Sequence, residues 1–204
     1  MDIFALDKAL KGRRVILASK SPRRRELLGL IFKDFDILPA EGEEVIPEGT
    51  AAEKASELLA LQKCREVAAK HPEALVIGCD TTVVVGEELC DILGKPSDRQ
   101  DAARMLRRLS GTRHRVISGA ALSLQGREVS FSEITWVRFR DLTDEEITDY
   151  VATGEPMDKA GAYGIQERGA LLVSGIEGDF FNVVGLPVSS LARAAAKLLL
   201  SVKV

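Results

Sequence analysis

Asp80 is the residue of this sequence whose surroundings most clearly indicate chemistry. It lies in an apolar run that reads Leu-Val-Ile-Gly-Cys-Asp-Thr-Thr-Val-Val-Val from Leu75 to Val85. Such a run is typical of a strand buried on both faces, where a carboxylate is costly unless a cation, a metal ion or a proton compensates it. Gly78, two residues earlier, would let another backbone or a ligand come close. The alternative is that Asp80 caps a turn between two strands.

A lysine could lie close to this carboxylate. The sequence predicts a helix over residues 50–69 that opens with a capping box formed by Thr50 and Glu53. Lys63 shares one face of this helix with apolar side chains at three- and four-residue spacing. These are Ala52, Ala55, Leu59 and Val67. A lysine in such a stripe either snorkels to solvent or pairs with an anion such as Asp80 or a phosphate.

The N-terminal region combines a strand, a polar turn and a helix start. Residues 15–18 are apolar, and Ser19-Lys-Ser-Pro-Arg-Arg-Arg25 follows, with Ser21 as the N-cap and Pro22 in the first helical turn. Free amides and the helix dipole would face one point and favour an anion there. Arginines in the first turn oppose the dipole, which is understandable if a polyphosphate binds them. The alternative is a solvated basic helix start.

Two loops carry further polar residues. Glu41-Gly-Glu-Glu44 is acidic, which normally indicates solvated surface. Residues 155–166 hold many small and charged side chains and suit a ligand-lining loop better than a core helix, with a surface turn as the alternative. Gln166 can donate and accept hydrogen bonds with one side chain, as the edge of a pyrimidine base requires.

The rest of the chain predicts the elements that position these residues. Residues 114–124 and 128–140 predict two long strands joined at Gln125-Gly126. His114 is predicted to be structural or solvent-facing. The other predicted elements are a strand at 35–38, a turn at Gly86-Glu87 that returns through 89–93, the loop of Lys95, a helix capped by Ser97 and Gln100, a helix opened by Thr143 and Glu146 and ended by Gly154, a hairpin of 170–176 and 180–184, and a helix beginning at Pro187.

Composition excludes several classes of function. The 204 residues carry a net charge of −3, so there is no overall electrostatic case for nucleic acid or membrane binding. Three cysteines without a CxxC pair predict reduced thiols in a cytoplasmic protein. Two histidines give zinc clusters and Ser-His-Asp catalysis little to build on. No apolar run is long enough to span a membrane, and the N-terminus lacks the apolar core of a signal peptide.

Several motifs in order resemble the Maf family of nucleoside triphosphate pyrophosphatases. The resemblance covers nearly the whole chain and leaves out the first dozen residues and the last few. The motifs are Ala18-Ser-Lys-Ser-Pro-Arg-Arg24, Gly78-Cys-Asp-Thr81, Gly94-Lys-Pro96, Leu109-Ser-Gly111, Glu155-Pro-Met-Asp-Lys-Ala-Gly-Ala-Tyr-Gly-Ile-Gln166 and residues 178–187.

The resemblance implies an α/β fold with a long, twisted mixed sheet flanked by helices and two lobes around a central cleft, as in Maf and inosine triphosphatase-like proteins. We expect a single domain over residues 1–204, because no segment reads as an independent linker. The family also suggests a homodimer. The implied reaction is hydrolysis of a nucleoside triphosphate between its α and β phosphates, giving the monophosphate and pyrophosphate.

The same resemblance implies roles for individual residues. Asp80 matches the general base, and Glu44 matches a carboxylate that helps Asp80 hold Mg²⁺ or Mn²⁺. Lys63 matches a family lysine, which favours pairing with Asp80 or a phosphate over snorkelling. Arg23, Thr81 and Gln166 match the positions that separate the family's subgroups, and the pattern here resembles the dTTP/UTP type. The expected phosphate contacts are Ser19, Ser21, Arg24, Lys63 and Lys95.

Two other functions stay open at this stage. A nucleotide-binding regulator of cell division without turnover would keep the same motifs, since the family was first linked to septum formation. A nucleic-acid module built on the basic clusters at residues 11–14 and 23–25 is weaker, because aromatic residues do not interleave with them and the overall charge is acidic.

Overall fold

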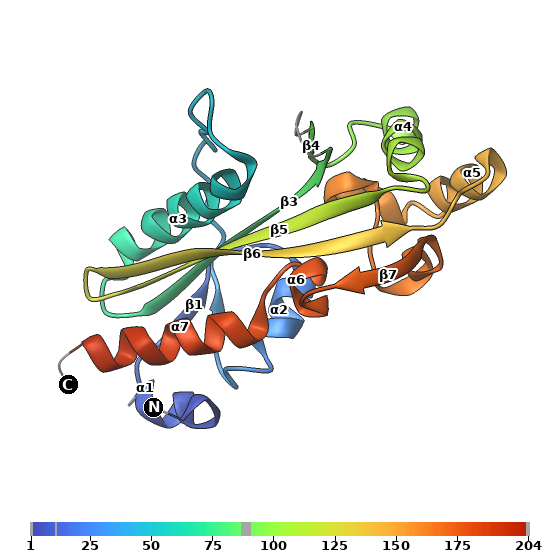
Figure 1. Ribbon diagram of the computed structural model, residues 1–204. Helices are drawn as coiled ribbons and strands as arrows, with labels where there is room; N and C mark the ends of the chain where they lie inside the picture. The colour runs from blue at the N-terminus through green and yellow to red at the C-terminus, as the bar shows by residue number, and fades with distance from the viewer. Residues whose placement is uncertain (1, 11, 87–90, 203–204) are drawn as a thin grey trace. The chain divides into compact units, whose positions relative to one another are not determined.

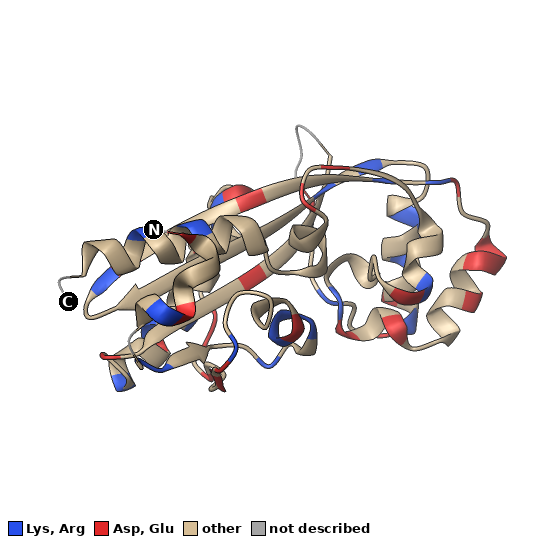
Figure 2. Ribbon diagram, turned by 90° about the horizontal axis from the view of Figure 1, so that it is seen from below, with Lys and Arg blue, Asp and Glu red and all other residues tan. Residues whose placement is uncertain are grey.

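The computed structural model describes residues 2–10, 12–86 and 91–202 (Figure 1). The described chain divides into two compact units. Unit 1 comprises Met1–Asp80, Ser118–Glu133 and Gly185–Val204, and unit 2 comprises Thr81–Ile117 and Ile134–Val184. Figure 2 shows basic and acidic residues in both units, as the nearly balanced composition leads one to expect. That residues 1–204 act as one domain stays a prediction.

The described residues form a seven-stranded mixed sheet, which confirms the predicted α/β class. The strand order is β2-β1-β3-β5-β6-β7, and β4 pairs with β3. β1 is parallel to β2 and β3, whereas β3 and β4, and β6 and β7, are antiparallel pairs. The strands are β1 (Val15–Leu17), β2 (Asp36–Ile37), β3 (Leu75–Val85), β4 (Asp91–Leu93), β5 (Arg113–Leu124), β6 (Arg127–Phe139) and β7 (Val173–Glu177).

Helices connect several of these strands and also precede the first and follow the last of them. The described α-helices are α1 (Leu6–Leu10), α2 (Pro22–Leu28), α3 (Ala52–Lys70), α4 (Arg99–Leu109), α5 (Asp144–Ala152), α6 (Phe180–Val184) and α7 (Val188–Ser201). Short 3₁₀ helices are η1 (Ile3–Ala5), η2 (Glu155–Asp158), η3 (Ala160–Ala162) and η4 (Glu167–Leu172). Of the helices in the described ranges, none combines the length and the apolar character needed to cross a bilayer.

In unit 1, α3 lies directly against the sheet. Figure 1 shows α3 on one side of the strands of this unit and α7 on the other. A Cβ at Gly78 would collide with the carbonyl oxygen of Ala60 and lie 2.7 Å from the amide nitrogen of Cys64. The glycine before Asp80 therefore lets α3 approach β3 closely. The core at this contact consists of Ile16, Ala18, Ala60, Cys64, Val67, Ala74, Val76 and Ala121.

Unit 2 has a core of its own. Helices α4 and α5 contact one another, and α4 also contacts η3. Gly161 comes so close to β3 that a Cβ there would lie 2.9 Å from Val83 Cγ2. Buried members of this core include Val83, Val85, Leu106, Val116, Val137, Phe139, Ile147, Tyr150, Tyr163 and Leu172.

Two predicted helix starts are wrong because the predicted capping hydroxyl does not cap the helix. The Thr50 hydroxyl donates to the carbonyl oxygen of Pro47 at 2.6 Å, so the hydroxyl serves a turn and α3 begins at Ala52 without a side-chain cap. The next predicted cap, Ser97, lies one residue too early. Asp98 is the N-cap of α4, and its carboxylate accepts the Asp101 amide at 2.8 Å.

The predicted hairpin of residues 170–184 is also wrong. Residues 167–172 form η4, β7 pairs with β6, and residues 180–184 form α6 instead of a returning strand. The Asp179 carboxylate accepts the Phe181 amide at 2.8 Å, which favours a helical start. Asn182 turns inward, and its amide donates to Val116 O at 3.1 Å and Thr135 Oγ1 at 2.9 Å. These partners lie far away in the sequence, so local periodicity did not indicate them.

Other predicted elements are confirmed. β5 and β6 are the two long strands, and Gln125 and Gly126 join them with positive φ angles of 50° and 74°. The capping box of Thr143 and Glu146 opens α5, and Gly154 follows it in a left-handed conformation. β4 returns antiparallel to β3 as predicted, whereas residues 87–90 of the predicted turn lie outside the described part of the chain.

His114 is structural, and the solvent-facing alternative is wrong. The residue is 0% exposed, and its Nε2 lies 2.8 Å from the Tyr163 hydroxyl. The rings of Phe139 and Tyr163 meet it edge-on at centroid distances of 5.1 and 5.4 Å. Burial lowers the pKa of His114 from 6.5 to about 4, so the imidazole is neutral in the folded protein at neutral pH.

This pKa shift predicts a loss of stability in mild acid. Between pH 6.5 and about 4 the unfolded chain binds the proton and the folded chain does not, so stability falls as the pH is lowered through this window. At a pH of about 5 the loss from this one group is roughly 2 kcal/mol. Urea unfolding of the parent and of His114→Gln at pH values of about 7.5 and 5 measures it. The stability difference between the two proteins should shrink by that amount on acidification, and a constant difference would contradict the assignment. His71→Gln is the control, because His71 lies partly exposed at the end of α3.

Candidate active site

Glu44, Lys63 and Asp80 meet in unit 1. Lys63 Nζ lies 2.6 Å from Asp80 Oδ1 and 2.9 Å from Glu44 Oε1. The side chains of Lys63 and Asp80 are 17% and 14% exposed, whereas that of Glu44 is 53% exposed. The predicted pairing of Lys63 with Asp80 is confirmed. β3 runs without interruption from Leu75 to Val85, so the alternative of Asp80 as a turn cap is wrong.

The acidic loop before α3 is anchored on that helix on both sides of Glu44. The Glu66 carboxylate accepts the amides of Glu41 and Gly42 at 3.0 and 2.9 Å, and these bonds lower the pKa of Glu66. The Gln62 side chain accepts the Val45 amide at 3.1 Å and donates to the Val45 carbonyl at 2.6 Å. The loop is therefore held at the edge of α3, with Glu44 turned toward Lys63.

The donor set at this point suits a hard cation. Over the described residues, no three His, Cys, Asp or Glu side chains are grouped so that they could hold a metal ion. Two carboxylate oxygens, from Glu44 and Asp80, nevertheless converge on the ammonium of Lys63. Mg²⁺ is commonly held by one or two carboxylates together with water and substrate phosphates. The residues present therefore fit Mg²⁺ or Mn²⁺. In this structure the ammonium of Lys63 supplies the positive charge between the two carboxylates.

The two described cysteines are free thiols, as predicted. Burial raises the pKa of Cys79 to about 11 and that of Cys64 to about 12. Both therefore stay protonated at neutral pH and are poor nucleophiles, although Cys79 precedes Asp80 in the chain. Cys90 lies outside the described residues. That Asp80 carries the reactive chemistry in this part of β3 stays a prediction.

The predicted turn between β1 and α2 is confirmed. Ser21 is the N-cap of α2 and accepts the Arg24 amide at 3.4 Å, with Pro22 in the first turn. Ser19 is buried, and its hydroxyl accepts the Ser21 amide at 3.3 Å. Arg23 is half-buried on the same helix. The contact of Ser19, Ser21 and Arg23 with a substrate stays a prediction.

Arg24 connects this turn to β3. Its guanidinium donates to the carbonyl oxygen of Cys79 at 2.8 Å, to Ser19 Oγ at 3.2 Å and to the carbonyl oxygen of Gly185 at 3.1 Å. The bond to Cys79 fixes the peptide immediately before Asp80. Arg24 therefore has a structural role in addition to the predicted phosphate contact.

The remaining predicted site residues belong to unit 2. Thr81 is half-buried in β3, Lys95 is exposed in the loop between β4 and α4, and Gln166 is half-buried at the start of η4. The segments that carry them approach each other at Gly161, whose amide donates to the Gly94 carbonyl at 3.0 Å and whose Cα faces Val83. That both groups of residues serve one site stays a prediction.

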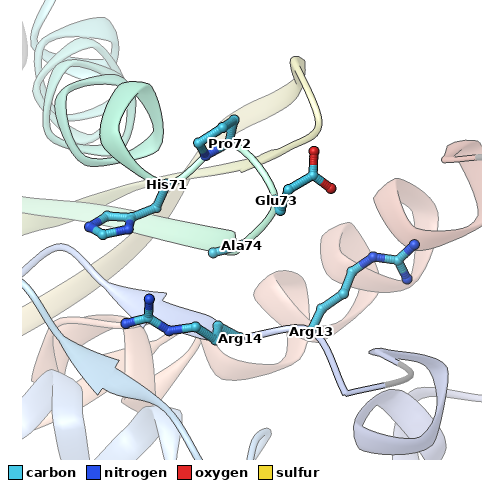
Figure 3. A pocket seen from close by; sticks show the side chains of 6 residues that line it. All are labelled: Arg13, Arg14, His71, Pro72, Glu73 and Ala74. Atoms are coloured by element: carbon cyan, nitrogen blue, oxygen red, sulfur yellow. The ribbon is translucent and has the colours of Figure 1, made fainter.

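A pocket in unit 1 lies at the amino-terminal ends of β1 and β3 and contains none of these residues. Figure 3 shows its lining: Arg13, Arg14, His71, Pro72, Glu73 and Ala74. The guanidinium groups of Arg13 and Arg14 point in opposite directions (Figure 3), and Arg14 forms an ion pair with Asp36 at 2.8 Å. The two arginines therefore do not converge on one ligand.

Sequence reasoning missed the side chains that support Gln166. Tyr150 and Glu155 hydrogen-bond to each other and to the backbone on either side of Gln166. Glu155 begins the motif quoted for the family resemblance, but it had no assigned role. Tyr150 had no predicted role either, and only its contact with a segment fourteen residues later reveals the polar function of its hydroxyl.

A solved structure shares the fold of this chain. The Ham1 protein of Staphylococcus aureus superposes with a TM-score of 0.54 over 91% of this chain and all of that chain, at 16% sequence identity. At this identity the likeness concerns the fold alone. It confirms a mixed α/β architecture of the kind that Ham1 proteins share.

The sequence defines the family. The profile of Maf-like proteins matches residues 14–198. The dTTP/UTP pyrophosphatase of a Geobacillus species is 52% identical over 91% of this chain and 98% of its own length. That of Bacillus velezensis is 48% identical over 89% of this chain and 95% of its own length. The chain belongs to the Maf family.

Proposed function

We propose that this protein is a nucleoside triphosphate pyrophosphatase that hydrolyses dTTP and UTP to the monophosphate and pyrophosphate. The observation that carries the proposal is the Lys63–Asp80–Glu44 cluster, in which a partly buried strand carboxylate is held 2.6 Å from a lysine. Relatives that are named dTTP/UTP pyrophosphatases and match along nearly their whole length support the choice of substrate.

In this proposal Asp80 is the general base. It accepts a proton from the water that attacks the α or β phosphorus, and Lys63 orients the carboxylate through the ion pair. As the triphosphate binds, Lys63 contacts its phosphate oxygens, together with Ser19, Ser21, Arg24 and Lys95. Breaking a phosphoanhydride bond depends mainly on such positioning and charge neutralisation.

Glu44 and Asp80 are the proposed ligands of Mg²⁺ or Mn²⁺. When bound, the ion supplies positive charge that stabilises the charge developing on the phosphate oxygens. Anchoring of the Glu44 loop on α3 through Gln62 and Glu66 fixes one ligand relative to the other.

Base selection is assigned to Gln166, with Arg23 and Thr81 as the other two selecting positions. Uracil and thymine present a carbonyl, an N–H and a second carbonyl along one edge. The Gln166 amide offers a donor and an acceptor to that edge, and nearby backbone groups could complete the pattern. This arrangement favours pyrimidines with two carbonyls over purines.

The remaining predictions are kept as part of the proposal. We expect a cytoplasmic homodimer in which the whole chain acts as one domain, without a nucleic-acid partner. The ion pair of Arg14 with Asp36 supports the last point, because Arg14 belongs to the basic cluster at residues 11–14.

Pyrophosphate release tests the function. With Mg²⁺ or Mn²⁺, the protein should release one pyrophosphate for each dTTP or UTP converted to its monophosphate, and it should prefer these substrates to GTP, CTP and 7-methyl-GTP. Orthophosphate as the product would contradict the reaction. Saturable binding of dTTP without any product would instead favour the nucleotide-binding regulator.

A further inference from the structure

The segment that carries Gln166 is closed by a pair of side chains. The Tyr150 hydroxyl accepts the Gly164 amide at 3.2 Å and donates to Glu155 Oε1 at 2.9 Å. The same Glu155 oxygen accepts the Gly169 amide at 3.1 Å. Two side chains thus join the two ends of the segment 164–169, and we call them the Tyr150–Glu155 clasp.

The backbone inside the clasp needs external support. Glu167, directly after Gln166, has a φ of +54°, a left-handed conformation that non-glycine residues rarely adopt. Such conformations persist where the surroundings over-determine them. Gly169 lies against Gly164, because a Cβ at Gly169 would collide with the Gly164 carbonyl and lie 2.7 Å from the Tyr150 hydroxyl. The loop therefore closes on itself at the clasp.

The chemistry of the clasp requires a hydroxyl group. An atom that accepts from an amide and donates to a carboxylate must carry both a lone pair and a proton, and the phenol of Tyr150 does. Burial raises the pKa of Tyr150, so the hydroxyl keeps its proton at all physiological pH values. Lys159 adds support from the other side, with its ammonium bound to the Glu155 carbonyl at 2.7 Å and its side chain against Gly164.

We propose that Tyr150 and Glu155 are positioning residues for Gln166, and that the clasp thereby sets how strongly the protein selects pyrimidine triphosphates. The inference rests on the proposed function. An amide reads a base edge through hydrogen bonds that lose most of their strength when the donor or acceptor is displaced or misaligned. A loosened loop would therefore lose base selection before it loses phosphate binding.

Tyr150→Phe is the first test, because it removes one oxygen and keeps the ring in the core. We expect the ratio of kcat/KM for dTTP to kcat/KM for GTP to fall roughly five- to tenfold, as for the loss of one or two hydrogen bonds. Glu155→Gln keeps an acceptor oxygen and should stay within about twofold of the parent ratio, whereas Glu155→Ala should lower it like Tyr150→Phe. This pair keeps the test decisive if Tyr150→Phe fails to fold.

Thr143→Ala is the matched control. It removes the capping hydroxyl at the start of α5, the helix that holds Tyr150, without touching the clasp. It should lower the melting temperature and leave the dTTP/GTP ratio unchanged. A purely structural role of the clasp would make Tyr150→Phe behave in the same way, and that result would overturn the inference.

A double-mutant cycle tests whether the clasp acts through Gln166. In a Gln166→Ala background, Tyr150→Phe should no longer change the dTTP/GTP ratio, because the side chain it positions is absent. The same fall in both backgrounds would overturn the inference. Failure of the proposed function is distinguishable, since it would appear in the parent protein as absent pyrophosphate release or a preference for purines.

Discussion

Asp80→Asn should reduce the turnover of dTTP by roughly two orders of magnitude or more, while the Kd for the nucleotide changes little. The amide keeps the size of the side chain and can still accept a hydrogen bond from Lys63, whose Nζ lies 2.6 Å from Asp80 Oδ1. It cannot take up the proton of the attacking water, and it removes one negative charge from the pair that would hold the metal ion. Steady-state kinetics with Mg²⁺ or Mn²⁺, together with nucleotide titration, measures both quantities.

Glu57→Gln is the matched control for this variant. Glu57 lies on α3, is 15% exposed and pairs with Lys54 at 2.8 Å, so it reproduces the burial and pairing of Asp80 away from the cluster. Its turnover should match that of the parent, and thermal unfolding of both variants verifies that they are folded. Near-normal turnover of Asp80→Asn with metal present would exclude Asp80 as the base.

Gln166→Glu should lower activity on dTTP and UTP far more than any residual activity on purine triphosphates. The carboxylate keeps the length of the side chain but loses the amide donor, and it faces a base carbonyl where neither group can donate. Such a mismatch leaves polar groups unpaired and should lower kcat/KM for dTTP and UTP roughly 10- to 100-fold. Any residual activity on GTP or 7-methyl-GTP should fall far less, because a cationic 7-methylguanine tolerates the new charge.

The comparison uses kcat/KM for dTTP, UTP, CTP, GTP and 7-methyl-GTP on both proteins. Gln100→Glu makes the same chemical change at an exposed position in the first turn of α4, within unit 2, and should keep the parent order of substrates. A parent that favours 7-methyl-GTP, or a Gln166→Glu variant with an unchanged order, would remove Gln166 from base recognition.

Much of the fold follows from local patterns in the sequence. The apolar run around Asp80 predicts a buried strand, and the helical spacing that places Lys63 among apolar residues predicts that it points inward. Both features are confirmed. The capping box at Thr143 and the turn at Gln125-Gly126 were also predictable, because their signals lie within a few residues of each other. Local structure is determined reliably where the residues of a pattern lie close together in the sequence and few other groups compete for their hydrogen bonds.

Tertiary structure decided the features that depend on partners far away in the chain. Helix α6 forms where a strand was predicted because the Asn182 side chain bonds to β5 and β6. The anchoring of the Glu44 loop on α3 and the clasp around Gln166 carry no local signature. Each consists of a side chain that satisfies backbone groups of another segment, so the sequence determined the chemistry available and the folded chain decided which groups it brought together.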